Sequence, residues 1–490
     1  MSVTSKVFTF LKANKYPFLI SLLFGIIYSL ISFVNHYQFR TYGADLGIYT
    51  NALYDYIHFQ WNDSTSFLLE ERNLLADHFD LYLILFSPLS LLFGAYTLLI
   101  VQIIALILGG FGVYSFLKVN RKPILLPVLG MIYFYSFFGV FGAVSYDYHS
   151  NVVAAAMVPW FFCFVKKRKL VYASLILSFI LIGKENMSLW MVFVCFGLLV
   201  IYWKDSKLKL YLFFSAVVCV FYFVVVSSTI MPSFTDGGSF SQFKYAVLGN
   251  SPSEAFWYLL SHPLDSFKIL FVNHNNSEFG NFVKLETHLI LLFCGLPFLL
   301  WRPQYMVMLI PIYVQKLFHN NSSMWGVNDQ YNIEFAPIMA MGIFMVLEEI
   351  KNKKLQKVLA IGIVVMGVGA SIRTMDNTVQ WSDKSKIRFY QARHYKRHYN
   401  VNDAHRELSK LPINAIISAQ GPFVPHVAYR DKVYQFPVIK DAEYIVFSDN
   451  EDYYVTSKNE FKTVTDSLRK SENWVITYDN AITILRKNHD

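Results

Sequence analysis

The sequence is dominated by apolar segments that are separated by short connections rich in lysine and arginine. The first apolar segment runs from Leu19 to Val34, and a second, longer one occupies residues 95–117. Hydrophobic residues make up 54% of the 490 residues and charged residues only 16%, which is too little polar surface for a soluble protein of this length. We therefore predict a protein that crosses a membrane several times.

The basic connections predict the side of the membrane that each one faces, because cytoplasmic loops are enriched in lysine and arginine. They are Lys6, Lys12 and Lys15; Lys118, Arg121 and Lys122; KKRK at 166–169; KDSKLK at 204–209; Arg302; and KNKK at 351–354. If all of them are cytoplasmic, the chain has about eleven spans, with its amino end inside and its carboxyl end outside. The expected spans are 17–36, 95–117, 124–144, 150–165, 170–184, 187–203, 209–231, 287–301, 304–318, 335–350 and 355–372.

The predicted fold is therefore mainly α, a polytopic helical membrane region over residues 1–372 with large outer loops at 37–94 and 232–287. The short apolar segment from Leu81 to Phe93 is expected to be re-entrant or interfacial, because a full span there would reverse the sides of all later basic connections. Residues 373–490 predict a small soluble α/β domain outside the membrane. Strands are expected at 415–419, 432–436 and 443–449, a helix at 458–470, and a hairpin about Asp479 and Asn480.

The first outer loop carries an unusual density of charged and aromatic residues for a connection between membrane helices, which predicts a structured loop at the membrane surface. Asp45 follows the first span directly and is our candidate catalytic residue. Arg40 is a candidate for binding a phosphate, and Asp77 and His78 form an acidic and basic pair near the end of the loop.

Further ionisable and aromatic side chains fall on the same predicted outer face. Charged groups at membrane depth are costly and usually face a cavity, so these residues are candidates for a site. They are Asp147 and His149 in SYDYHS, Lys184 and Glu185 in GKEN, Tyr331 and Glu334 before a span, Arg393 in a basic run, and His426 in FVPHVAYR.

Several stretches of the chain, in order, resemble a family of bacterial multi-pass proteins known as domain of unknown function 2079. They are ADLGIYTNALYDY, ADHFDLYLILFSPLSLLFG, SYDYHSN, GKEN, DQYNIEFAPIMA and the tail from LPINAIISAQ to EYIVFSD. In architecture this family resembles the C-type (GT-C) glycosyltransferases, which take a sugar from a polyprenyl-phosphate carrier on the outer face. The resemblance implies a transferase in the bacterial inner membrane, with its amino end cytoplasmic and its C-terminal domain periplasmic. The expected partners are membrane lipids, the lipid-linked sugar donor, and an acceptor glycan, lipid or protein.

Such a transfer needs a carboxylate to accept the proton of the acceptor hydroxyl and a cation to stabilise the departing phosphate. Asp45 matches the acidic position of the loop, so we assign it as the base or, alternatively, as a metal ligand. Arg40, Lys184 and Arg393 are the candidate phosphate-binding cations. Glu185, Tyr331, Glu334 and His426 are candidate contacts to the substrates. Asp77, His78, Asp147 and His149 could together bind a divalent cation such as Mg²⁺ or Mn²⁺, although no cofactor is required by the pattern.

Each assignment has a structural alternative. Asp45 could cap a helix, Lys184 and Glu185 could neutralise each other, and His426 could support a turn. At the level of function, the alternatives are a transporter or flippase of a lipid-linked or polar solute, and a non-catalytic membrane scaffold. Nucleic acid is not an expected partner, because the basic clusters lie in the connections between spans. No phosphate-binding glycine loop for ATP is present.

Overall fold

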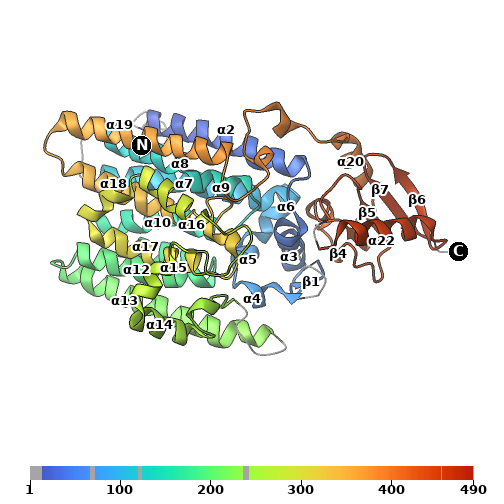
Figure 1. The fold of residues 1–490 in the computed structure, drawn as a ribbon, viewed down its shortest axis with the longest axis horizontal. Coiled ribbons are helices and arrows are strands. Elements are labelled where there is room, and N and C mark those ends of the chain that lie inside the picture. The colour runs from blue at the N-terminus through green and yellow to red at the C-terminus, as the bar shows by residue number, and fades with distance from the viewer. Residues whose placement is uncertain (1–13, 67–71, 120–123, 236–241, 454, 489–490) are drawn as a thin grey trace, which may run out of the picture. The chain divides into compact units, whose positions relative to one another are not determined.

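The computed structural model describes residues 14–66, 72–119, 124–235, 242–453 and 455–488 (Figure 1). The chain forms two compact units. The helical unit comprises Met1–Ser29, Gln102–Ser145 and His149–Arg388, and the sheet unit comprises Leu30–Val101, Tyr146–Tyr148 and Phe389–Asp490. Of the basic residues used to predict topology, Lys6, Lys12, Arg121 and Lys122 lie outside the described residues.

Among the described residues, four helical stretches are long and apolar enough to cross a bilayer, whose hydrocarbon core needs about 20 helical residues. They are Lys15–Tyr37 (α2), Tyr82–Lys118 (α5 to α7), Ser206–Phe234 (α13, Ser206–Val225, with the turns after it) and Lys353–Asp376 (α19). The pair α8 (Leu125–Ser136) and α9 (Phe138–Ser145), bent by 41°, could form a fifth span. These helices support a mainly helical membrane protein, whereas the count of eleven spans stays a prediction.

The other expected spans correspond to shorter apolar helices. These are α10 (Ser150–Lys166), α11 (Leu170–Leu181), α12 (Glu185–Ile201) and α18 (Phe335–Glu348). The segments expected at 287–301 and 304–318 form α16 (Val283–Phe293), a short 3-10 turn and α17 (Pro303–Leu317). An 11-residue helix such as α16 rises about 16 Å, which is about half the thickness of the hydrocarbon core.

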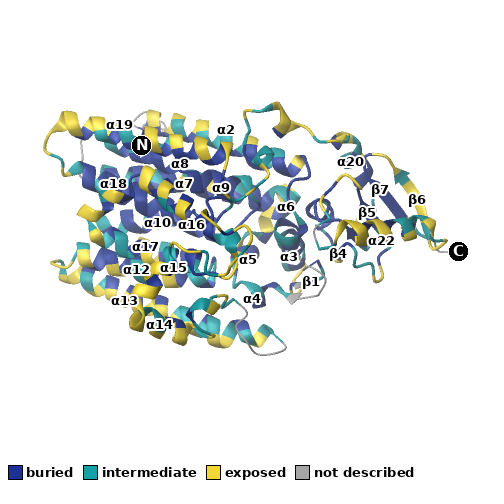
Figure 2. Cartoon of the chain, viewed as in Figure 1, coloured by how far each residue is buried: buried dark blue, intermediate teal, exposed yellow. Residues whose placement is uncertain are grey.

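Buried tyrosines organise the core of the helical unit. The Tyr28 hydroxyl donates to the Tyr135 carbonyl at 2.7 Å, and the Tyr133 hydroxyl donates to the Cys294 carbonyl at 2.6 Å. Because these phenols are fully buried, each needs such a partner. Figure 2 shows that α8, α9 and α10 are mostly buried, whereas α13 is largely exposed. Exposed apolar side chains on α13, such as Phe213 and Phe221, are what a lipid-facing helix presents.

The residues expected to form the second outer loop are partly helical. α14 (Pro252–Ser261) begins at Ser251, whose side chain accepts a hydrogen bond from the Glu254 backbone N–H, and α15 (Pro263–Ile269) follows it. Their inner faces pack into a small apolar cluster that contains Trp325. This part of the chain is therefore a folded element of the helical unit.

The sheet unit contains a five-stranded mixed sheet in the order β4-β3-β5-β7-β6. The strands are β3 (Ile417–Ala419), β4 (Val433–Gln435), β5 (Tyr444–Phe447), β6 (Trp474–Asp479) and β7 (Thr483–Lys487). β3 is parallel to β4 and β5, and β7 is antiparallel to β5 and β6. All three expected strands and the expected hairpin therefore form.

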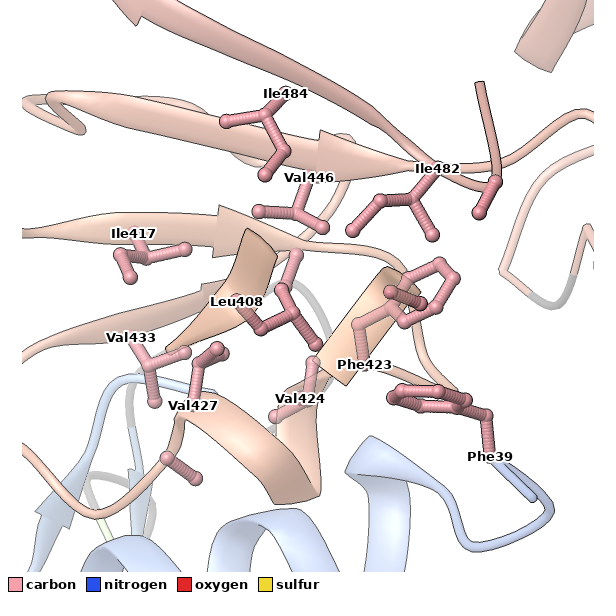
Figure 3. Packing of buried hydrophobic residues seen from close by; sticks show 14 of the residues in the cluster. Phe39, Leu408, Ile417, Phe423, Val424, Val427, Val433, Val446, Ile482 and Ile484 are labelled. Atoms are coloured by element: carbon pink, nitrogen blue, oxygen red, sulfur yellow. The ribbon is translucent and has the colours of Figure 1, made fainter. Parts of the chain in front are cut away.

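Alternating residues of the strands build a core on each face of the sheet. Val446 and Ile484 join α20 (Val401–Leu408) and α21 (Val424–Val427) in one cluster, which Figure 3 shows at close range. Ile445 and Leu485 join α22 (Lys458–Lys470) in the cluster on the opposite face. α22 has the predicted bounds, and its capping box between Ser457 and Glu460 explains why it begins there.

The first loop belongs to the sheet unit. It forms η1 (Gly43–Gly47), α3 (Ile48–Ile57), α4 (Leu74–Asp77) and a two-residue pairing of β1 (Asp63–Ser64) with β2 (Arg72–Asn73). Phe39 is fully buried in the cluster with Phe423 (Figure 3), and the Gly43 N–H donates to the Gly421 carbonyl at 2.9 Å. The loop is therefore held to the C-terminal elements by apolar packing and by backbone hydrogen bonds.

The apolar segment after the loop is a series of short helical pieces. α5 (Tyr82–Phe86), a 3-10 turn that contains Pro88, and α6 (Ser90–Phe93) lead to Gly94 and then to α7 (Thr97–Lys118). Gly94 has a φ of 51°, a conformation that costs glycine little. Whether this segment is re-entrant, as expected, stays a prediction.

Candidate active site

Asp45 lies in a single π-helical turn, η1, which follows α2 after a short connection. The glycines at both ends of this turn allow it to pack closely on the C-terminal elements. A Cβ atom on Gly47 would lie 2.7 Å from Cγ1 of Val424, and one on Gly43 would lie 2.2 Å from Oε1 of Gln435. Isolated π turns occur often at functional sites, and this one holds the Asp45 carboxylate on a rigid backbone.

Two carboxylates meet at this turn. The Tyr146 hydroxyl donates to Oδ2 of Asp45 at 3.2 Å, and the Tyr42 N–H donates to Oδ2 of Asp147 at 2.8 Å. Asp147 is only 2% exposed, whereas Asp45 is partly exposed. The buried Asp147 therefore stabilises the turn through the Tyr42 N–H. Asp45 is the carboxylate that a substrate could reach.

The environment of Tyr42 keeps its phenol neutral. Burial is the main cause that raises the pKa of Tyr42 well above its ordinary range, and the negative charge of Glu451 acts in the same direction. Glu451 itself is ion-paired with Arg397 and accepts a hydrogen bond from the Tyr399 hydroxyl. Acidic groups and phenols thus gather on this side of the sheet unit, and one cation balances part of the charge.

Arg40 has a structural position in the sheet unit. It is 3% exposed, and its guanidinium donates to the backbone carbonyls of Arg393, at 3.1 Å, and of Lys396, at 2.8 Å. It also donates to the carbonyl of His394. Arg40 therefore shapes the basic segment, and the exposed Arg393 side chain is the cation of this pair that is open to a phosphate.

His426 lies in a buried group of aromatic rings contributed by three helices or their ends. Its ring stacks on His36, from α2, with centroids 4.2 Å apart, and it meets the ring of His405, from α20, at 5.2 Å. Phe39 contacts both His405 and His426, with centroids 4.4 Å away in each case. The Tyr37 carbonyl accepts a hydrogen bond from Nε2 of His405 at 2.8 Å.

This histidine cluster predicts that the sheet unit loses stability in acid. Burial lowers the pKa of His405, and burial together with the charges of His36 and His405 lowers the pKa of His426. Both rings are neutral in the folded chain, whereas in the unfolded chain they protonate near pH 6.5. The stabilisation from the neutral rings is therefore complete above that pH and falls below it, by up to about 1.4 kcal/mol per pH unit for each of these two histidines.

Hydrogen exchange of the sheet amides between pH 8 and pH 5, corrected for the intrinsic exchange rate, measures this effect. His426→Phe keeps a ring of similar shape and should flatten the pH dependence. His58→Phe, which alters a ring in an exposed position of the first loop, should leave the dependence unchanged. Equal stability of the wild-type sheet at both pH values would contradict the prediction.

Asp77 and His78 are adjacent, and Nε2 of His78 lies 3.9 Å from Oδ2 of Asp77. They and Asp147 belong to the sheet unit, whereas His149 belongs to the helical unit. Across the described residues, no three His, Cys, Asp or Glu side chains come together in a way that could hold a metal ion.

The helical unit gathers a second set of the predicted residues. Nε2 of His149 lies 2.9 Å from Nε2 of Gln330, and the Asn151 amide donates to Oε1 of Glu334 at 2.8 Å. His149 and Glu334 are both buried. Polar side chains from α10 and from the turn before α18 therefore form one buried group.

Lys184 and Glu185 stand at the start of α12, Lys184 as the residue before the helix and Glu185 in its first turn. Glu185 is 2% exposed, and its position suits the positive end of a helix dipole. Tyr331 is partly buried in the turn that precedes α18. The predicted residues are thus divided between the two units, five in the helical unit and seven in the sheet unit.

Sequence reasoning did not assign several residues that complete these groups. Tyr146 precedes Asp147 directly, so the SYDYHS motif already contained it. Gln330 stands beside the selected Tyr331, and Asn151 lies two positions after the selected His149. His36 and His405 gave no such signal, because 369 positions separate them and only the folded chain brings both rings against His426.

Comparison with known proteins gives one assignment. A family model described as a predicted membrane protein (DUF2079) matches residues 35–480, and no curated protein matches the chain. The matched range includes η1, the Tyr146–Asp147 pair, the histidine cluster and strands β3 to β6 of the sheet, whereas β7 follows it. Several apolar helices of membrane-spanning length accompany the match. The chain therefore belongs to the DUF2079 family of predicted membrane proteins.

Proposed function

We propose that this protein is a membrane glycosyltransferase that moves a sugar from a polyprenyl-phosphate donor to an acceptor hydroxyl, with Asp45 as the base. The observation that carries the proposal is the position of Asp45, which is partly exposed on a rigid turn and held by the Tyr146 hydroxyl. A general base must be oriented and must be within reach of the proton that it accepts. The reaction class rests on the resemblance to the C-type glycosyltransferases.

The reaction is a single displacement. The acceptor oxygen bonds to the anomeric carbon of the sugar while the bond from that carbon to the phosphate oxygen breaks. Asp45 accepts the hydroxyl proton, and polyprenyl phosphate leaves with the bonding electrons. The Tyr146 hydroxyl orients the carboxylate, and the buried Asp147 holds the turn through the Tyr42 N–H.

The departing phosphate needs a cation, because charge develops on its oxygen in the transition state. In the sheet unit, the exposed Arg393 is our candidate, since the Arg40 guanidinium donates to backbone carbonyls. His426, also in the sheet unit, is proposed to contact the donor or the acceptor. The roles of Lys184, Glu185, Tyr331 and Glu334 stay predictions from the sequence. The proposed location is the bacterial inner membrane, with the sheet unit on the periplasmic face.

A transporter of a lipid-linked or polar solute is the second candidate. The observation that favours it is the buried polar group of His149, Asn151, Gln330 and Glu334 in the helical unit. Ionisable residues inside a helical membrane region often mark a path for ions or substrates.

One experiment separates the two functions. The full chain is reconstituted in liposomes with a polyprenyl-phosphate sugar that carries a label on the sugar, and a lipid extract of bacterial membranes supplies acceptors. A transferase should move the label to a product that lacks the prenyl chain and release polyprenyl phosphate. Movement of intact donor across the bilayer without a labelled product would overturn the transferase proposal in favour of transport.

A further inference from the structure

A groove of about 610 Å³ lies between α16 and α19 of the helical unit. Its walls are almost entirely apolar, and several of the side chains that line it are strongly exposed, among them Phe282 at 73% and Phe293 at 58%. α19 is one of the helices long and apolar enough to span a membrane. The other lining residues that matter here are Leu285, Leu289, Ile290, Met366 and Gly369.

The two helices give the groove a polar end and an apolar end. Arg373 and Glu286 line it together and form an ion pair at 3.4 Å. Met366 lies seven residues before Arg373 on α19, and Phe293 lies seven residues after Glu286 on α16, so each helix extends the groove by about 10 Å from the ion pair. The far end is lined by apolar side chains, among them Met366, Phe293 and Ile290.

The Arg373 guanidinium retains the capacity to bind an anion. One guanidinium nitrogen bonds the Asn377 carbonyl and another faces Glu286, yet the side chain is 49% exposed. Both carboxylate oxygens of Glu286 accept a hydrogen bond from the Val379 N–H, at 3.0 and 3.1 Å. Arg373 is therefore not the only group that donates to this carboxylate. A guanidinium has five N–H donors and binds phosphate oxygens well.

We propose that this groove binds one bilayer phospholipid, with an acyl chain along the apolar walls and the headgroup phosphate on Arg373. Arg373 lies three residues before the end of α19, the level at which a spanning helix meets the headgroups. Below it, exposed apolar walls in a bilayer are covered by hydrocarbon. The groove is open along its length, so the second acyl chain stays in the surrounding bilayer.

This site is separate from the proposed transfer reaction. None of the residues that line it is among those that we assign to the transfer reaction. A negative result for the transfer reaction therefore leaves the lipid site untouched, and the reverse also holds.

Gly369 offers a direct test, because a Cβ atom at this position would meet nothing within 4 Å. Gly369→Leu places a side chain in the groove, and it removes a poor helix former from the interior of α19. Gly362→Leu is a matched control, because Gly362 lies on the same helix, has the same open space and does not line the groove. Both variants should therefore fold.

The measurement is native mass spectrometry of the purified full chain after stepwise removal of lipid and titration with phosphatidylglycerol. The wild type and Gly362→Leu should retain one phospholipid, and Gly369→Leu should bind it about tenfold more weakly, which corresponds to about 1.4 kcal/mol. Arg373→Gln should weaken phosphatidylglycerol but leave the binding of uncharged diacylglycerol unchanged. Unaltered phospholipid affinity in Gly369→Leu would overturn the site, as would retention of polyprenyl phosphate in place of any phospholipid.

Discussion

Replacing Asp45 with asparagine should lower glycosyl transfer by about 10²–10⁴-fold, the usual contribution of a general base. The amide has nearly the same shape as the carboxylate, and its oxygen can still accept the hydrogen bond from Tyr146. It cannot take up the proton of the acceptor hydroxyl. Initial rates of label transfer from the polyprenyl-phosphate sugar, with donor and acceptor in excess, measure the effect.

Two further variants test whether the loss of transfer is specific to the Asp45 carboxylate. Asp466→Asn removes a carboxylate from an exposed position on α22, so transfer should match the wild type. Tyr146→Phe removes only the hydrogen bond at 3.2 Å to Asp45 and should give a smaller loss than Asp45→Asn. Full transfer activity in a well-folded Asp45→Asn protein would exclude Asp45 from the mechanism.

Phe39→Ala should destabilise the sheet unit by about 3–5 kcal/mol, the range for deleting a buried phenylalanine side chain. Phe39 is fully buried and packs in one cluster with strands β3, β5 and β7. Its ring also contacts His405, His426 and Phe423. Removing it leaves a cavity between the loop after α2 and the C-terminal elements, which their packing can fill only in part.

Hydrogen exchange of the β3, β5 and β7 amides in the full chain provides the measurement, and Phe59→Ala is the matched control. Phe59 lies in the same loop, also follows a helix, and has a φ of 57°, close to the 53° of Phe39. Because Phe59 is 99% exposed, its replacement places alanine in the same backbone conformation without opening a cavity. Similar exchange in Phe39→Ala and the wild type would contradict the packing described here.

The local elements were the most predictable part of this chain. The helix over 458–470 was predicted with the bounds of α22, because a capping serine, a glutamate three residues later and an amphipathic pattern are all local signals. The strands were found from short β-branched and aromatic runs. The membrane helices α2 and α19 were found from apolar length alone.

The candidate site was predictable only in part. Asp45 was selected from its place after the first span and its match to the acidic position of the loop, and Asp147 from its charge at membrane depth. The structure gives each of them a hydrogen-bonded partner in the sheet unit. The role of Arg40 in binding the carbonyls of the segment after it could not be foreseen. Its partners lie more than 350 positions away, and no local pattern records such a contact.

The sequence by itself determined that the chain is a membrane protein, where its apolar helices lie and which C-terminal segments form strands, because composition and periodicity act over neighbouring residues. Only the tertiary structure decided that the first loop folds with the C-terminal sheet through Phe39, that three histidine rings contact one another beside it, and that a groove lies between α16 and α19. These features depend on contacts between residues far apart in the chain. Such contacts depend on how the packed surfaces fit together. The residues of any one segment do not specify that fit.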